Sequence, residues 1–318
     1  MAGRLIFGGV DGTGDFFNRS YEATFANSHV KVLSDYWNEG PAHYRRGPWW
    51  QGDWTYVEAY RIHKAVVADW KKDDAVFLAG YSRGGAAVIE IAKWLRDDGI
   101  PVECLVLLDP VDRTRMMGDS WNGWQDSAIV DTVRQVIYAQ RSPNALSRES
   151  FGNCGLVRHG NIGLDHKRQF HATHGGVGGT PWSKPVIGVI DEGAPDFKTN
   201  VTVPMDNAGS AAVQKWIWRL LFNAIERCKE RMAKPGGPVE WVPGFQLPGQ
   251  QPTSRPGGAA GNSGKERIHV VVQGDWLSKI ALKYYGDAMK YKVIHQANLK
   301  VIGPNPDVIK PGQRLVIP

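Results

Sequence analysis

Cysteine is scarce in this chain. Three cysteines stand among 318 residues, far apart and without the Cys-x-x-Cys spacing that is typical of a zinc site: Cys104, Cys154 and Cys228. An odd number of widely separated cysteines does not build a disulfide framework. We therefore expect each one to be buried as a small apolar side chain, and we expect neither a metal nor a cofactor.

Long apolar runs and blocks of like charge are also missing. No run approaches the roughly 18 apolar residues of a membrane-spanning helix, and the apolar stretch near Met1 is too short for the core of a signal peptide. We expect the protein to be made in the cytoplasm without a Sec signal. The net charge of +6 is spread along the chain, without the basic block and interleaved aromatics of a nucleic-acid-binding surface. No nucleic-acid partner is therefore expected.

Proline and glycine, in contrast, are concentrated in one segment. Residues 234–265 are rich in proline, glycine, serine and glutamine, and they contain too few apolar residues to form a core. This composition predicts a flexible linker between two folded units. The first unit would be a catalytic domain over residues 1–233, and the second a small domain over residues 266–318.

Strand-length apolar runs alternate with segments of helical spacing in the first part of the chain. The runs are residues 5–10, 76–79 and 102–108, and the helical segments are residues 54–70 and 86–92. Such alternation predicts parallel strands joined by right-handed crossovers, the α/β class. An amphipathic helix over residues 208–232 would cover one face of the sheet. Residues 133–138 fit a strand or a helix.

A G-x-S-x-G motif joins one of these runs to the following helix. Its residues are Gly80, Tyr81, Ser82, Arg83 and Gly84. In a nucleophile elbow, a sharp strand-to-helix turn raises the serine hydroxyl above the sheet, and small residues avoid a clash there. The N–H of Arg83 would lie at a helix N-terminus, where it can donate to an oxyanion. The alternative is an ordinary glycine-rich turn with a solvated serine.

An acid and a base for this serine follow in the chain order of an α/β-hydrolase. Asp109 follows directly after residues 102–108, where a triad acid belongs, and Asp112 is its rival. His174 precedes a run of small residues that permits a tight open loop beside a site. The alternative bases are His171, His166 and His159. Ser82, Asp109 and His174 together would form a catalytic triad.

Four short segments resemble the type VI secretion lipase-effector family and its α/β-hydrolase relatives. They are LIFGGVDGTGD (5–15), VFLAGYSRGGA (76–86), VLLDPVD (105–111) and THGGVGG (173–179). The resemblance implies that Ser82 is the nucleophile, Asp109 the acid and His174 the base, with Asp11 and Gly12 as a second oxyanion element beside Arg83. The chain has Gly175 and Gly176 where the family often has Ser-Asp. From the residues alone, the loop after Asp11 is equally a site or a plain turn.

The C-terminal segment resembles a LysM module over nearly its whole length. VVVQGDWLSKIALKYYGDAMKYKVIHQAN and IKPGQRLVIP fit its order of strand, two helices and strand, a small βααβ domain. The resemblance implies binding of N-acetylglucosamine-containing glycans such as peptidoglycan along two loops. Those loops hold Gly274, Asp275, Trp276 and Leu277, and Asn305, Pro306, Asp307 and Ile309. LysM-like units also occur as assembly modules.

The sequence thus favours a serine esterase or lipase. We expect a phospholipase-type antibacterial effector that is delivered to the envelope of a target bacterium, with secretion-machinery and immunity proteins as partners. One alternative is a hydrolase of a cell-wall ester or amide, as in a phage-type lysin. Another is a non-catalytic LysM assembly protein whose elbow has lost its activity.

Overall fold

The computed structural model describes most of the chain. The described residues are 3–14, 18–48, 55–112, 128–148, 152–160, 162–182, 199–233, 267–272, 275, 277–285, 290–303 and 309–318. They form two compact units, the first with the elements from β1 to α6 and the second with those from β7 to β8. The predicted linker lies outside the described residues, so its boundaries stay predictions.

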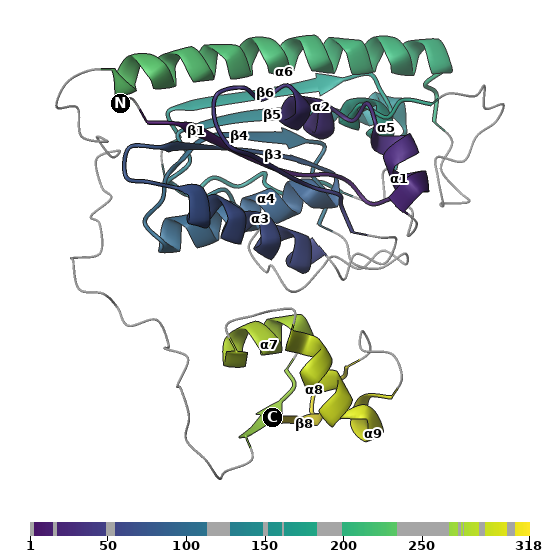
Figure 1. The fold of residues 1–318 in the computed structure, drawn as a ribbon. Coiled ribbons are helices and arrows are strands. Elements are labelled where there is room, and N and C mark those ends of the chain that lie inside the picture. Colours follow the sequence, from purple (N-terminus) through teal and green to yellow (C-terminus); the bar gives the residue numbers. More distant parts are fainter. Residues whose placement is uncertain are drawn as a thin grey trace. The chain divides into compact units, whose positions relative to one another are not determined.

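A parallel sheet forms the centre of the first unit (Figure 1). Its six strands have the order β2-β1-β3-β4-β5-β6. The strands are β1 (Leu5–Val10), β2 (Ala42–Arg45), β3 (Ala75–Tyr81), β4 (Val102–Leu108), β5 (Gln135–Arg141) and β6 (Leu164–Phe170). In the register, Tyr81 pairs with Leu108, which in turn pairs with Ala139. The residues that follow β3, β4 and β5 therefore meet at one edge of the sheet.

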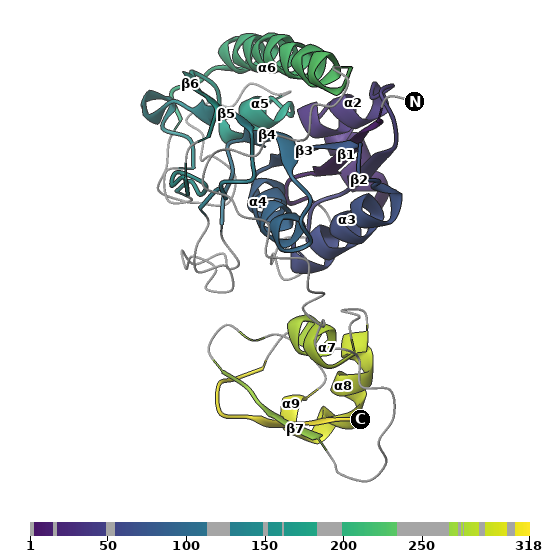
Figure 2. The same ribbon diagram turned by 90° about the vertical axis from the view of Figure 1, so that its left-hand side faces the viewer.

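Helices cover both faces of this sheet (Figure 2). One face is covered by α3 (Thr55–Asp69) and α4 (Arg83–Asp97), and the other by α2 (His29–Asp35), α5 (His174–Gly178) and α6 (Val203–Met232); α1 is Asn18–Phe25. Because both faces are covered, β1, β3 and β4 are buried along their whole length and are almost wholly apolar. The predicted α/β-hydrolase-like architecture is confirmed.

Two segments differ from the simplest expectation. Residues 135–141, in the stretch whose pattern fitted a strand or a helix, form β5. The glycine-rich stretch that begins at His174 is not an open loop but the short helix α5. Thr173 starts this helix, because its Oγ1 accepts a hydrogen bond from the N–H of Gly176 at 3.0 Å.

The second unit contains β7 (Arg267–Val270), α7 (Leu277–Tyr285), α8 (Tyr291–Ala297), α9 (Leu299–Ile302) and β8 (Arg314–Ile317). β7 and β8 pair in antiparallel register, with Ile268 opposite Val316. The helices and strands enclose a small apolar core of Val271, Leu277, Ile280, Ala281, Ile294, Leu315 and Ile317. The predicted βααβ arrangement is confirmed, with α9 as an additional short helix.

All three cysteines are free and buried, as the sequence predicts. Burial raises the pKa of Cys228 to about 12, so this thiol is a packing group rather than a nucleophile. Among the described residues, no helix is both long and apolar enough to cross a membrane. That part of the chain also contains no group of three or more histidine, cysteine, aspartate or glutamate side chains that could hold a metal ion.

We predict that Gly84→Ala destabilises the first unit through a steric clash with β1. A Cβ at this position would lie 2.1 Å from the carbonyl oxygen of Val10, and we expect a loss of about 2 to 3 kcal/mol in the free energy of unfolding. Urea denaturation measures this loss. The control is Gly99→Ala, which has no atom within 4 Å but a φ of +76° and should cost about 1 kcal/mol. Equal losses in the two variants would contradict the steric explanation.

Candidate active site

Ser82 lies in the turn between β3 and α4 in a strained conformation. Its φ of 54° and ψ of −125° are angles that residues with a side chain rarely adopt. Three backbone hydrogen bonds hold the turn: Ser82 N–H donates to the Leu108 carbonyl at 3.0 Å, and the N–H groups of Val111 and Gly85 each donate to the Ser82 carbonyl at 2.9 Å. The flanking glycines are needed because a Cβ on Gly80 would lie 2.2 Å from the Gly84 carbonyl oxygen. The local geometry is that of a nucleophile elbow.

His174 lies within hydrogen-bond distance of both other predicted triad residues. Its Nε2 is 2.9 Å from Ser82 Oγ, and its Nδ1 is 2.7 Å from Asp109 Oδ2. The aromatic ring of Tyr81 packs against the imidazole, with 5.0 Å between the ring centroids. An ionised carboxylate only accepts hydrogen bonds, so Nδ1 carries the proton. Nε2 is therefore left to accept the proton of Ser82.

The other candidate histidines lie elsewhere in the first unit. His171 and His159 are exposed, and His166 lies half-buried on the edge strand β6. His174 is 3% exposed and stands at the start of α5, at the edge where the strands end. The structure thus selects His174 from the four candidates as the partner of Ser82.

Asp109 is the carboxylate that contacts this histidine, and Asp112 is not. Asp109 is fully buried directly after β4. Burial alone would raise its pKa, but the charge of Arg141 and hydrogen bonds with His174 and Asn153 outweigh burial and lower the pKa to about 2. Burial raises the pKa of Asp112 to about 7, and its Oδ1 has no hydrogen-bond partner in the described part of the chain. Asp109 is the one suited to orient an imidazole.

A second buried carboxylate, Asp206 in the first turn of α6, fixes the position of the His174 segment. Its Oδ1 accepts from the Thr173 N–H at 2.7 Å, and its Oδ2 accepts from Thr173 Oγ1 at 2.8 Å and from the Trp182 N–H at 3.0 Å. These three bonds join both ends of the α5 segment to the long helix. The imidazole is thereby positioned by α6 although it belongs to α5.

The predicted oxyanion residues lie beside Ser82. Arg83 is the first residue of α4, so its N–H is at the helix N-terminus, while its guanidinium donates to Thr13 Oγ1 at 2.7 Å. A Cβ on Gly12 would lie 3.2 Å from Ser82 Cβ, so the loop after β1 runs directly past the nucleophile. The Gly12 N–H itself donates to Asp11 Oδ1 at 3.0 Å. The oxyanion role of Arg83, Asp11 and Gly12 stays a prediction.

The side chain of Asp11 is buried against neighbouring elements and does not face solvent. Its fully buried carboxylate accepts hydrogen bonds from Ser28 Oγ and, at 2.9 Å, from Tyr44 OH. Burial raises its pKa to about 6, with these hydrogen bonds opposing the rise. Asp11 therefore ties β1 to α2 and β2, and the groups of this loop that can donate to a substrate are its backbone N–H groups and the Thr13 hydroxyl.

Besides Asp206, three further polar residues at the site were not predicted from the sequence. Arg141 and Asn153 contact the carboxylate of Asp109, and Ser147 Oγ accepts from the His174 N–H at 2.9 Å. Arg141 ends β5, in a stretch whose pattern did not identify a strand, and the other two follow in the connection to β6. An identified strand at residues 135–141 would have placed Arg141 at the edge of the site.

In the second unit, some of the predicted glycan-binding residues lie outside the part of the chain that the structure describes, and the others lie within it. Gly274, Trp276, Asn305 and Asp307 lie outside the described residues. Asp275 Oδ2 is 2.7 Å from His269 Nε2 and accepts from the Val272 N–H at 3.0 Å. Leu277 is 2% exposed in the core and Ile309 packs against that core. The side chain of Leu277 therefore supports the loop, and glycan binding by these residues stays a prediction.

Comparison with known proteins identifies the C-terminal unit. Residues 269–318 match the LysM domain family. The chain is 52% identical over 54 residues to an uncharacterized protein of Deinococcus radiodurans, covering 17% of this chain and 20% of that protein. It is 46% identical over 50 residues to Esterase Rv1288 of Mycobacterium tuberculosis, covering 16% of this chain and 10% of that protein. The chain thus spans a fifth or less of these relatives.

Two solved structures share a weak similarity with the chain. One is a cutinase-like protein from Cryptococcus sp., with 13% identity and a TM-score of 0.33 over 70% of this chain and 95% of that one. The other is an uncharacterized protein from Pseudomonas aeruginosa, with 10% identity and a TM-score of 0.38 over 56% of this chain and 42% of that one. The fold itself is defined by the strand order β2-β1-β3-β4-β5-β6, the turn at Ser82 and the geometry of the triad.

We predict that activity persists below the ordinary pKa of histidine. Burial lowers the pKa of His174 below 6.5, and the opposing attraction of Asp109 does not cancel this effect. The base must be neutral to accept a proton, so kcat/KM should rise with pH through an apparent pKa that lies below 6.5 and then level off. Hydrolysis of p-nitrophenyl acetate from about pH 4 to about pH 8 measures this limb. An apparent pKa above that of free histidine would contradict the assignment.

Proposed function

We propose that this protein is a serine esterase that acts near peptidoglycan, to which its LysM domain holds it. The observation that carries the proposal is the continuous hydrogen-bond path from Ser82 Oγ through His174 to Asp109. A serine hydroxyl is a weak nucleophile until a base accepts its proton, and an imidazole needs a carboxylate to hold its tautomer. The three groups have the distances, burial and protonation states that this chemistry requires.

The reaction proceeds in two halves. Ser82 Oγ attacks the ester carbonyl carbon while its proton passes to His174 Nε2, and the carbonyl oxygen becomes an oxyanion. As the carbon–oxygen bond to the leaving alcohol breaks, Nε2 returns this proton to the alcohol oxygen, leaving an acyl group on Ser82. A water molecule then attacks the acyl carbon with its proton passing to Nε2. The acid is released as Nε2 returns the proton to Ser82 Oγ.

The oxyanion is stabilised by backbone donors in this proposal. The N–H of Arg83 lies at the start of α4, where the helix dipole also favours negative charge. The loop after Asp11 passes close to Ser82, and we expect its backbone to supply the second donor. The bond between the Arg83 guanidinium and Thr13 Oγ1 fixes this loop relative to the elbow.

The finer part of the proposal is a phospholipase-type antibacterial effector that reaches the periplasm of a target bacterium. The segments around Ser82, Asp109 and His174 that resemble type VI lipase effectors support it. Secretion-machinery and immunity partners follow from the same resemblance. A second candidate is a hydrolase of a cell-wall ester or amide, and the LysM match favours it because that module implies binding to the wall.

We predict that Ser82→Ala lowers kcat for a soluble ester by at least about 1,000-fold, because the acyl-enzyme can no longer form. The matched control is Ser34→Ala, which removes a partly exposed hydroxyl on α2. A fluorophosphonate probe should label the wild type and the control but not Ser82→Ala. A folded wild type that neither hydrolyses the ester nor reacts with the probe would refute the esterase and favour a binding or assembly protein.

Fatty-acid release from phospholipid vesicles separates the two substrate classes. Release by the wild type and by Ser34→Ala, but not by Ser82→Ala, would support the phospholipase. If the probe labels Ser82 and vesicles release no fatty acid, the wall substrate is favoured. Release of acids or of new amino groups from purified peptidoglycan would then distinguish ester from amide hydrolysis.

We predict that the protein co-sediments with purified peptidoglycan independently of catalysis, because the LysM domain is a separate unit from the triad. Ser82→Ala should sediment to the same extent as the wild type. Soluble N-acetylglucosamine oligomers should compete for both proteins. A loss of sedimentation in Ser82→Ala would show that the triad unit, rather than the LysM domain, makes the contact.

A further inference from the structure

Two groups share one oxygen of the acid at the triad. Asp109 Oδ2 contacts His174 Nδ1 at 2.7 Å and also forms an ion pair with Arg141 Nη1. The other oxygen, Oδ1, accepts from the Arg141 N–H at 3.2 Å and from Asn153 Nδ2 at 2.8 Å. Arg141 is 7% exposed and Asp109 is fully buried. The acid is therefore paired with a permanent cation as well as with the catalytic base.

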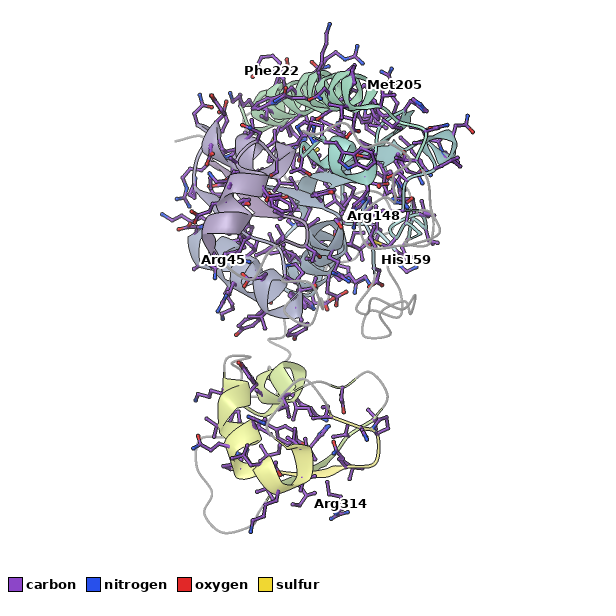
Figure 3. All side chains as sticks on the ribbon, turned by 90° about the vertical axis from the view of Figure 1, so that its right-hand side faces the viewer. Arg45, Arg148, His159, Met205, Phe222 and Arg314 are labelled. Carbon is purple, nitrogen blue, oxygen red and sulfur yellow. The ribbon has the colours of Figure 1, made fainter. Side chains whose placement is uncertain are left out.

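The remaining donors of Arg141 bind the segment that follows β5. Its Nε donates to the Ser147 carbonyl at 2.7 Å, and its Nη2 donates to the Arg148 carbonyl at 2.8 Å. Ser147 in turn accepts from the His174 N–H through its hydroxyl. Figure 3 views the first unit from the side on which the strands end, and Arg148 is labelled on that side. One guanidinium thus connects the acid, this segment and, through Ser147, the base.

We infer that Arg141 is a positioning residue that holds the Asp109 carboxylate in place and keeps the His174 imidazole in its neutral, proton-accepting form. The inference rests on the proposed esterase function. A planar guanidinium suits this task because it donates to the carboxylate and to two carbonyls at once. Lysine has a single charged nitrogen and cannot make the same set of contacts.

The effect of Arg141 on the pKa of His174 follows from the net charge of the Asp109–Arg141 pair. A carboxylate alone attracts an imidazolium and raises the pKa of the histidine. The pair of Asp109 and Arg141 carries no net charge, and an imidazolium on His174, which contacts the same carboxylate oxygen, meets the like charge of the guanidinium nearby. Burial is the largest cause that lowers the pKa of His174, and the positive charges of Arg148 and then of Arg141 act in the same direction. Burial raises the pKa of the adjacent Tyr81 well above its ordinary value, so that phenol stays neutral. His174 is therefore a weaker base than a free imidazole, and it stays neutral and able to accept a proton in mildly acidic solution.

The test replaces the cation while keeping a polar side chain. In Arg141→Gln, the pKa of His174 should rise by about one unit or more, because Asp109 loses its paired cation and one of the two repelling charges is removed while Arg148 remains. Proton NMR titration of the His174 Cε1–H signal, identified by its absence in His174→Gln, measures this pKa without any substrate. The acid limb of kcat/KM for p-nitrophenyl acetate should move to higher pH by the same amount.

Asn153→Ala is the matched control. It removes a neutral hydrogen bond from the same carboxylate and leaves every charge in place, so the pKa of His174 should move by less than about 0.3 unit. An unchanged pKa in folded Arg141→Gln, or an equal shift in the control, would overturn the inference. Because the titration needs no substrate, it stands even if the wild type hydrolyses no ester, an outcome that would count against the esterase alone.

Arg141→Lys keeps the inference testable if the glutamine variant does not fold. Lysine retains the positive charge but not the carbonyl contacts, so the pKa of His174 should stay within about 0.3 unit of the wild type. The looser carboxylate should lower kcat by at least about tenfold. A kcat equal to that of the wild type would show that the contacts of the guanidinium do not position the triad.

Discussion

The close approach of β1, β3 and α4 at the nucleophile turn is the constraint on which the site depends. A side-chain atom on Gly84 would lie 2.1 Å from the Val10 carbonyl oxygen, and one on Gly80 would lie 2.2 Å from the Gly84 carbonyl oxygen. Backbone therefore packs directly on backbone. This packing holds Ser82 in its strained conformation, points the start of α4 at the nucleophile and brings the loop after β1 to its side.

Two fully buried aspartates show how the surroundings decide the state of a carboxyl group. Asp11 receives its hydrogen bonds from neutral groups, Ser28, Tyr44 and a backbone N–H, and its pKa is raised to about 6. Asp109 faces a guanidinium as well as neutral donors, and its pKa is lowered to about 2. Burial acts in the same direction on both. The first carboxyl group is suited to holding elements together, and the second to supporting a charge-separated reaction.

Much of the fold and the three central residues could be predicted because their signals are local. Ser82 lies in a short motif with a strand before it and a helix after it, and Asp109 follows a continuous apolar run. His174 required a choice among four histidines, which only the packing of α5 against α6 resolves.

Arg141 carries no local signal, since an arginine at the end of an unassigned segment is ordinary in sequence. Its role arises from parallel pairing of β5 with β4, a contact between distant parts of the chain. The edge strand β6, exposed on most of its residues, also lacks the apolar pattern of the buried strands.

Thr173 donates two hydrogen bonds to Asp206, and these bonds determine when the base of the site can be held in place as the chain is synthesised. Ser82 precedes His174 by 92 residues, and the clamping carboxylate follows Thr173 by a further 33. A chain that is still being synthesised carries the serine and its acid long before α6 exists to hold the imidazole in place. His174 is held beside Ser82 only once the start of α6 has docked on the Thr173 segment, so the chain up to His174 alone does not keep this imidazole in place.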